Sequence, residues 1–217
     1  MNYRETLYKN ALNHLRWIYE ESKYNPDVDL HRSFDILQSV SDNQFTSKEW
    51  LVEKLVPFLQ EKNLYSIAVL GSWYGLTSLL LREQIGPEVH INNVDSDPLS
   101  HQIGRSLLKG THDKKTHFIT QNAEDWMIEN IRNMDVIINT STEHMEADDV
   151  KLITQLKKPK DIICFQGNNY HSPQSHINTY DSLDEFEESL CLTKTYYKGS
   201  LPGPEADNYD RYMVIGI

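Results

Sequence analysis

The stretch "AVLGSWYGLTS", residues 68–78, joins a short apolar run to the start of a helical pattern. The run "YSIAVL" (65–70) ends at Gly71, and Gly75 follows four residues later, just before "LTSLLLREQI" (76–85). A strand, a glycine turn and a helix N-terminus in this order form an anion or nucleotide site, because backbone N–H groups and the helix dipole face the ligand. The stretch therefore predicts an α/β sheet that binds a ligand at the carboxyl end of this strand.

Downstream of this turn, apolar strand candidates alternate with helical patterns. The strand candidates cover 88–95, 115–122, 134–140 and 161–167, and the helical patterns cover 98–110, 124–131 and 148–157. This alternation predicts a mostly parallel sheet with right-handed crossovers and helices on both faces. After a helical pattern at 182–190, two strand candidates at 191–199 and 210–217 lack a helix between them, which predicts an antiparallel C-terminal hairpin at the sheet edge.

The N-terminal part, residues 1–61, is predicted to form a helical cap on a Rossmann-like domain of residues 62–217. A third helix is expected to start at a T-x-x-E capping box made by Thr46 and Glu49. The buried faces are predicted to be Tyr8, Leu12, Leu15 and Tyr19 in the first helix, and Leu30, Phe34 and Leu37 in the second. The segment 38–50 either covers the ligand pocket or only connects the cap helices.

Charge and hydropathy restrict the partners. The 217 residues carry a formal charge of −11, from 32 acids and 21 bases, which repels a phosphate backbone and disfavours nucleic acid. The polar N-terminus is no signal peptide, and no apolar run approaches the ~18–20 residues of a membrane span. We therefore expect a cytoplasmic protein, away from membranes, that acts on a small molecule or a protein, with the oligomeric state left open.

Three nucleotide and catalytic motifs fail at this turn. A P-loop needs a second glycine five residues after the first, where Leu76 stands. The dinucleotide fingerprint needs glycines at the positions of Trp73 and Leu76. A hydrolase elbow needs G-x-S-x-G, which Gly71, Ser72 and Trp73 do not match. The P-loop, the dinucleotide fingerprint and the hydrolase elbow are therefore excluded as interpretations of this turn.

An acid stands at the end of the second strand candidate. Asp95 lies 20 residues beyond Gly75, in "NNVDSDP". At this place in an open α/β sheet, a carboxylate accepts hydrogen bonds from ribose hydroxyls, which indicates an adenosine-type ligand. The alternative is that Asp95 and Asp97 only cap the helix that starts at Pro98.

The order of these motifs resembles the Rossmann-like S-adenosylmethionine-dependent methyltransferases over about residues 60–217. The resemblance implies S-adenosyl-L-methionine as cofactor, with Asp95 on the ribose and with Asn122 and the amides after it facing adenine. The cofactor-binding residues that it implies are Gly71, Ser72, Trp73 and Gly75 in the first motif, Asp95 and Ser96 in the second, Asn122, Ala123 and Glu124 after the third strand, and Asn139 at the end of the fourth.

The chain departs from that family at two positions in the first motif. Val69 stands where the family often has an acid, and Trp73 stands in place of its middle glycine. Either the amino-acid end of the cofactor is held differently, or the ligand is not that cofactor. A related enzyme for aminobutyl transfer or lyase chemistry, or a non-catalytic partner subunit with this fold, therefore remains an alternative to a methyltransferase.

The expected chemistry lies at the end of the fourth strand, in "NTSTEHM" (139–145). His144, with an ordinary pKa of about 6.5, is predicted to remove a proton from an O–H or N–H acceptor, and Glu143 to orient it or the substrate. The alternative is that Glu143 caps the next helix and His144 lies on a polar surface. The segment lacks the [DN]-P-P-[YF] signature of base-amine methyltransferases, which favours O or N methylation of another acceptor.

A long polar loop, residues 166–182, follows the fifth strand and is predicted to form part of the acceptor pocket. Its expected substrate-binding residues are Asn168, Asn169, Tyr170 and His171. His171 and His176 do not have the spacing of a known metal pair, so no metal is expected from the sequence.

Overall fold

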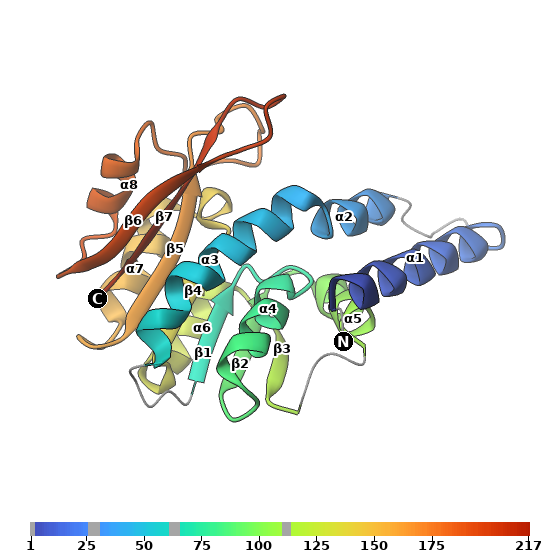
Figure 1. The fold of residues 1–217 in the computed structure, drawn as a ribbon, viewed down its shortest axis with the longest axis horizontal. Helices are drawn as coiled ribbons and strands as arrows, with labels where there is room; N and C mark the ends of the chain where they lie inside the picture. The colour runs from blue at the N-terminus through green and yellow to red at the C-terminus, as the bar shows by residue number, and fades with distance from the viewer. Residues whose placement is uncertain (1–2, 26–30, 61–65, 110–113) are drawn as a thin grey trace.

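The computed structural model describes residues 3–25, 31–60, 66–109 and 114–217 (Figure 1). Within these ranges, seven strands form one sheet in the order β3-β2-β1-β4-β5-β7-β6. The strands are β1 (Ser66–Leu70), β2 (His90–Asp95), β3 (Thr116–Thr120), β4 (Val136–Asn139), β5 (Ile162–Asn168), β6 (Thr195–Pro202) and β7 (Asp210–Gly216). The first five strands are parallel, and β7 runs antiparallel between β5 and β6. The predicted α/β sheet with its antiparallel C-terminal hairpin is confirmed.

Helices cover both faces of the sheet. The crossover and C-terminal helices are α4 (Leu76–Ile85), α5 (Pro98–Leu107), α6 (Ala123–Asn130), α7 (Ala147–Leu156) and α8 (Leu183–Ser189), with short 3-10 turns η1 (Ile131–Asn133) and η2 (Thr142–His144). Because successive strand residues point to opposite faces, Ala68 and Leu70 of β1 pack in a core with α6, α7 and α8, while Ile67 and Val69 pack beneath α3 (Asp42–Gln60). Val69 is fully buried in that second core.

The N-terminal helices are α1 (Tyr3–Ser22), α2 (His31–Ser39) and α3, which lies along the sheet in Figure 1. The predicted start of α3 is wrong: the helix begins at Asp42, so the Thr46–Glu49 box lies inside it. The amide of Gln44 donates to the hydroxyl of Ser41 at 3.4 Å, which places the cap before Asp42.

The predicted apolar faces of α1 and α2 are only partly correct: Tyr8 and Leu15 of α1 are partly buried and pack against the core. The α1 face that packs next to α5 carries Leu7, Ala11 and Ile18, whereas Leu12 and Tyr19 are 65% and 62% exposed. In α2 the buried apolar residue is Ile36, whereas Phe34 and Leu37 are exposed, and Leu30 lies outside the described residues. Packing partners rather than apolar periodicity decide which side is buried. Among the helices that the structure describes, none combines the length and apolar character that a bilayer crossing requires.

Candidate active site

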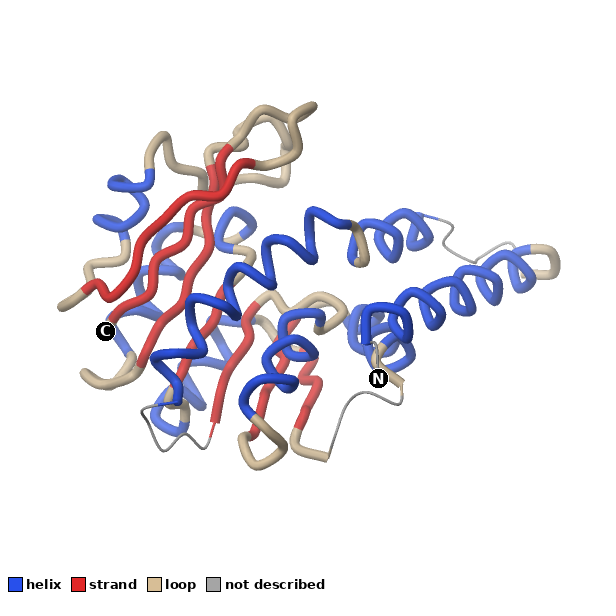
Figure 2. The backbone as a smooth tube through the Cα atoms, viewed as in Figure 1, coloured by secondary structure: helices blue, strands red, loops and turns tan. Residues whose placement is uncertain are grey.

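A cavity of about 770 Å³ lies at the carboxyl ends of the parallel strands. Figure 2 shows the loops that follow these strands next to the first turns of α3. The walls come from both predicted and unexpected segments. They include residues 71–74, Asp95 and Ser96, Asn122 and Ala123, residues 140, 141 and 143–146, Asn168, Tyr170, His176 and Ile177, Gln38, Ser39, Asn43, Gln44 and Lys48, and Asp207, Tyr209 and Arg211. The segment 38–50 thus both connects α2 to α3 and covers the pocket.

The glycine turn after β1 takes a left-handed backbone at three positions. Gly71 has φ 57°, Trp73 has φ 49° and Gly75 has φ 83°. A Cβ on Gly71 would lie 2.7 Å from the Cβ of Ser141, whose hydroxyl donates to the Gly71 carbonyl at 3.1 Å. The loop after β4 therefore requires glycine here. The Trp73 ring stacks on Tyr74, with 5.1 Å between centroids, and lines the cavity without closing it.

Asp95 joins the turn to the end of β2. Its Oδ2 accepts from the Trp73 amide at 2.8 Å, and its Oδ1 accepts from the Asp97 amide at 3.0 Å. The helix cap belongs to Asp97 instead, which accepts from the Leu99 amide and pairs with Arg32 of α2 at 2.6 Å. Burial works to raise the pKa of Asp97, but the Leu99 amide and the Arg32 guanidinium outweigh it and lower that pKa.

Two of the three residues predicted to face adenine lie in the cavity wall. Asn122 and Ala123 line the cavity, but Glu124 does not. The Oδ1 of Asn122 caps α6 by accepting from the amides of Glu124 at 2.8 Å and Asp125 at 3.3 Å. The Glu124 amide is therefore already bonded, contrary to the expectation that it is available to a ligand.

The part of the cavity lined by the turn after β1 and by Asp95 fits an adenosyl group. The Ser72 hydroxyl is buried at the turn, and it lacks a hydrogen-bond partner among the described residues. Each carboxylate oxygen of Asp95 accepts one amide and retains a second lone pair. Ribose hydroxyls would satisfy these acceptors, and the glycine turn lets a ligand approach the backbone closely.

Asn139 supports the loop after β4 and does not line the cavity. Its side chain is fully buried, accepts from the Ser141 amide at 2.9 Å and donates to the Met145 sulfur at 3.0 Å. Asn139 is not among the residues that line the cavity. At this strand end Thr140 and Ser141 line the cavity, and Asn139 fixes the loop that carries Glu143.

Glu143 and His144 lie together in η2, and both line the cavity. The helix α7 begins at Ala147 with Glu146 in the capping position. The alternative is therefore wrong in that Glu143 does not cap this helix, whereas His144 is exposed, as the alternative expected. The Nδ1 of His144 lies 3.0 Å from the Ser175 carbonyl, which orients the ring.

Two of the four predicted substrate-binding residues of the loop after β5 reach the cavity. Asn168 and Tyr170 line it, whereas Asn169 and His171 do not. Successive side chains of an extended segment point to opposite sides. Asn169 accepts from the Asp210 amide at 2.7 Å instead, and the exposed His171 lies 3.1 Å from the Asp181 carboxylate.

Lys48 is a site residue that the sequence interpretation missed. It is buried on α3, with Nζ 3.5 Å from the Gln166 Oε1. Burial lowers the pKa of Lys48 from 10.5 to about 7; the Arg211 charge adds to this shift and the Glu143 carboxylate opposes it. The available signal was its spacing of three residues from Leu51, which places a lysine on the apolar stripe of the helix.

The C-terminal hairpin supplies another part of the cavity wall that the sequence interpretation missed. Tyr209 stacks on Tyr170, with 4.7 Å between ring centroids and 11° between ring planes. Its hydroxyl accepts from Arg211 at 3.0 Å and from Asn43 of α3 at 3.5 Å. This residue closes the cavity between the loop after β5 and the N-terminal helices.

By sequence, the chain matches no family model and no curated protein. By structure, it is similar to the N-methyltransferase NodS from Bradyrhizobium japonicum WM9 in complex with S-adenosyl-L-homocysteine (TM-score 0.61, 12% identity, 95% of this chain and 97% of that one). An O-methyltransferase from Bacillus cereus in complex with the same compound (SAH) has a TM-score of 0.60 and 13% identity over 95% of this chain and 90% of that one.

A third similar structure is the CurJ carbon methyltransferase, with a TM-score of 0.63 and 14% identity over 84% of this chain. The match spans 58% of the CurJ chain. At these identities the likeness shows the fold. The chain has the Rossmann-like fold of S-adenosylmethionine-dependent methyltransferases, which N-, O- and C-methyltransferases share.

Proposed function

We propose that the protein is an S-adenosyl-L-methionine-dependent methyltransferase that methylates an oxygen or nitrogen of a small-molecule acceptor. One observation carries this proposal: a single cavity joins the turn at Gly71 and the Asp95 carboxylate to a polar chamber with Lys48, Glu143 and Tyr170. Its volume of about 770 Å³ lies within the range of about 300–1,000 Å³ for small-ligand sites. Walls from α3 and the hairpin favour a small acceptor over a protein surface.

The cofactor half is assigned to the turn and the end of β2. Similar structures that contain S-adenosyl-L-homocysteine support this cofactor class. When bound, the cofactor supplies an electrophilic methyl group on a sulfonium. Asp95 holds the ribose, Ser72 adds a hydroxyl contact, and Trp73 forms the wall on the methionine side.

The part of the cavity that is proposed to hold the methyl acceptor contains its own base. A lysine whose pKa lies near 7 is substantially neutral at physiological pH, so the Lys48 amine takes a proton from an O–H or N–H acceptor. Glu143 and His144 face the same chamber and contact the acceptor. The protein's contribution is alignment of the two reactants and removal of this proton.

Calorimetry with S-adenosyl-L-homocysteine, S-adenosyl-L-methionine, NAD and ATP tests the cofactor assignment. We expect the first two to bind and the last two to bind at least tenfold more weakly. An absence of binding by the first two at millimolar concentration excludes the proposal.

The sulfur-containing product then identifies the reaction. Methyl transfer leaves S-adenosyl-L-homocysteine, whereas aminobutyl transfer or lyase chemistry leaves methylthioadenosine, and the two differ in mass. Small-molecule extracts incubated with S-adenosyl-L-methionine and enzyme serve as the acceptor pool. Lys48→Met should lose turnover and keep cofactor affinity, while Lys54→Met, on the exposed side of the same helix, should keep both.

A further inference from the structure

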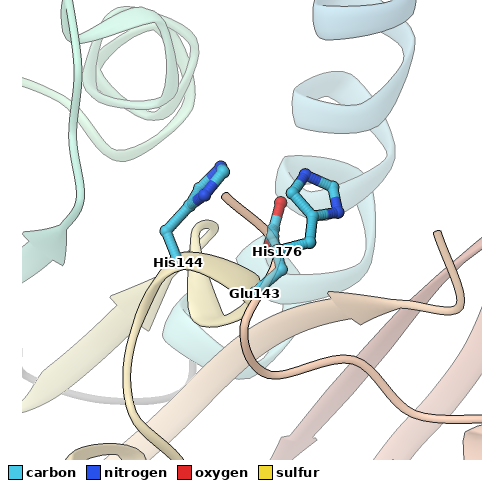
Figure 3. A group of neighbouring side chains, drawn as sticks. All are labelled: Glu143, His144 and His176. Atoms are coloured by element: carbon cyan, nitrogen blue, oxygen red, sulfur yellow. The ribbon is translucent and has the colours of Figure 1, made fainter. Parts of the chain in front are cut away.

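Three potential metal ligands come together on the acceptor side of the cavity. Glu143 and His144 belong to η2 after β4, and His176 belongs to the loop after β5 (Figure 3). One carboxylate oxygen and one ring nitrogen from each histidine all lie within 4.8 Å of one another. In Figure 3 the carboxylate tip of Glu143 lies between the two imidazole rings. The sequence spacing hid this group because its members come from two separate strand ends.

Backbone carbonyls fix both histidines in the tautomer that binds a metal. The Nδ1 of His144 lies 3.0 Å from the Ser175 carbonyl, and the Nδ1 of His176 lies 2.7 Å from the Tyr170 carbonyl. A carbonyl only accepts, so each Nδ1 carries the proton and donates it. Each neutral ring then has its lone pair on Nε2. Histidines that bind metals use this same second hydrogen bond for orientation.

The two segments that carry the ligands are held together by their backbones. The Glu143 carbonyl accepts from the amides of Ile177 at 2.9 Å and Asn178 at 3.3 Å. The Asn178 side chain also donates to the Thr142 carbonyl at 3.3 Å. The position of His176 relative to Glu143 is therefore set by the fold before any ion binds.

We propose that Glu143, His144 and His176 bind one divalent first-row transition-metal ion. Two neutral imidazoles and one carboxylate are a donor set for Zn²⁺, Mn²⁺, Fe²⁺, Co²⁺ or Ni²⁺, and three protein ligands leave coordination positions open for an exogenous oxygen. Bonds of about 2.0–2.2 Å bring donor atoms within roughly 4 Å of one another, so small side-chain rotations from the present spacing complete the site.

This site deepens the proposed function and, as to the acceptor, rests on it: the acceptor is a small molecule with a hydroxyl that binds the ion. A bound ion would make this hydroxyl more acidic. The hydroxyl would lose its proton to the Lys48 amine as the O–CH₃ bond forms and the S–CH₃ bond breaks with its electron pair left on sulfur, and Glu143, His144 and His176 would hold the ion. His144 then acts as a ligand, and the base role expected for it belongs to Lys48.

The test uses Co²⁺ alone with the chelator-treated protein. We expect one equivalent to bind with visible ligand-field absorption. His144→Gln and His176→Gln should each weaken apparent Co²⁺ affinity at least tenfold, and the double variant should lose the absorption. Thermal unfolding of the apo variants, with midpoints near the wild-type value, confirms that they are folded.

Two controls separate this site from other histidines. His171→Gln changes an exposed histidine of the same loop and should leave the titration unchanged. His90 and His117 form an exposed pair on β2 and β3, with ring nitrogens 3.1 Å apart, which competes for Co²⁺. The titrations are therefore repeated in a His90→Gln background, where the strong equivalent should persist.

Each outcome decides the inference. Co²⁺ binding that survives the double variant, or that disappears in His90→Gln, overturns it. Calorimetry with S-adenosyl-L-homocysteine on the chelator-treated wild type separates the two proposals. If S-adenosyl-L-homocysteine binds and Co²⁺ does not, the metal site is overturned and the methyltransferase proposal stands. If Co²⁺ binds and S-adenosyl-L-homocysteine does not, the metal site is supported and the cofactor assignment is removed.

Discussion

The amide of Trp73 donates to the Asp95 carboxylate at 2.8 Å and so ties the turn after β1 to the end of β2. The residue that replaces the family's middle glycine therefore does not disrupt the turn. Its backbone contacts the acid that is expected to hold the ribose, and its ring stacks on Tyr74. The departure at Trp73 and the acid at Asp95 therefore meet in one hydrogen bond.

The first prediction concerns this carboxylate. Asp95→Ala should weaken S-adenosyl-L-homocysteine binding by about 1–3 kcal/mol, because the ribose hydroxyls lose an acceptor. Analogues that lack the 2′- or 3′-hydroxyl should bind wild type less tightly and should bind Asp95→Ala no worse than the parent compound. Calorimetry measures this double-mutant cycle. Asp148→Asn, an exposed acid outside the cavity, is the control, and wild-type affinity in Asp95→Ala would remove Asp95 from the ribose.

The second prediction concerns the left-handed backbone of Gly71. Gly71→Ala imposes a left-handed alanine, which costs about 1–2 kcal/mol. The new Cβ also meets the Cβ of Ser141 at 2.7 Å. Overpacking should therefore cost Gly71→Ala about another 1–3 kcal/mol of unfolding free energy. At Gly86 a Cβ meets nothing within 4 Å, so the loss in Gly86→Ala reports only the cost of its own backbone, with φ 76° and ψ 177°. Urea unfolding measures both variants, and a Gly71→Ala loss no larger than the backbone cost of about 1–2 kcal/mol would contradict the close approach of the β4 loop.

The sequence predicted the fold well because its signals are local. The apolar runs, the glycines that end them and the helical spacings predicted β1, α4 and the C-terminal hairpin within a few residues. The α1 face was predicted only in part because Leu7 and Leu12 are equally apolar, and tertiary packing decides that Leu7 is buried and Leu12 exposed. Such information is not in the periodicity of one helix.

The site was predictable only where its residues lie at or follow the end of a strand, as do Gly71, Asp95, Asn122, Glu143, His144, Asn168 and Tyr170. Gly71 and Asp95 lie at strand ends within recognisable spacing, so their meeting followed from a parallel sheet. Lys48 and Tyr209 reach the cavity from α3 and the hairpin, far apart in sequence and without a motif. Pairing of β7 with β5 and packing of α3 on the sheet bring them together, and neither register is encoded locally.

The third prediction concerns the wall formed by the hairpin. Tyr209→Ala removes the ring that stacks on Tyr170 and should speed amide hydrogen exchange in residues 169–177. S-adenosyl-L-homocysteine affinity should stay within about twofold of wild type, because the change lies outside the cofactor half. Tyr196→Ala, which removes a stack on Phe58 in the same hairpin, is the control. Unchanged exchange in residues 169–177 of Tyr209→Ala would show that this stack does not hold the loop.

The fourth prediction is a pH dependence of stability that Lys48 causes. Its native pKa of about 7 lies below the ordinary value of 10.5, so between these values the unfolded chain holds a proton that the native protein does not. The free energy of unfolding of wild type relative to Lys48→Met should therefore rise with pH across this window, by at most about 1.4 kcal/mol per pH unit. Below pH 7 both states are protonated, and the difference should be constant.

Urea unfolding at pH 6 to 10 measures this difference, with Lys54→Met as the matched control. Lys54 lies on the same helix, and its hydrogen bond to the Glu53 carboxylate raises its pKa. It therefore stays protonated in both states over the window, and its variant should run parallel to wild type. A Lys48→Met curve parallel to wild type as well would mean that Lys48 is charged in the native protein, and the Lys48 amine would then be unable to take a proton from the acceptor at neutral pH.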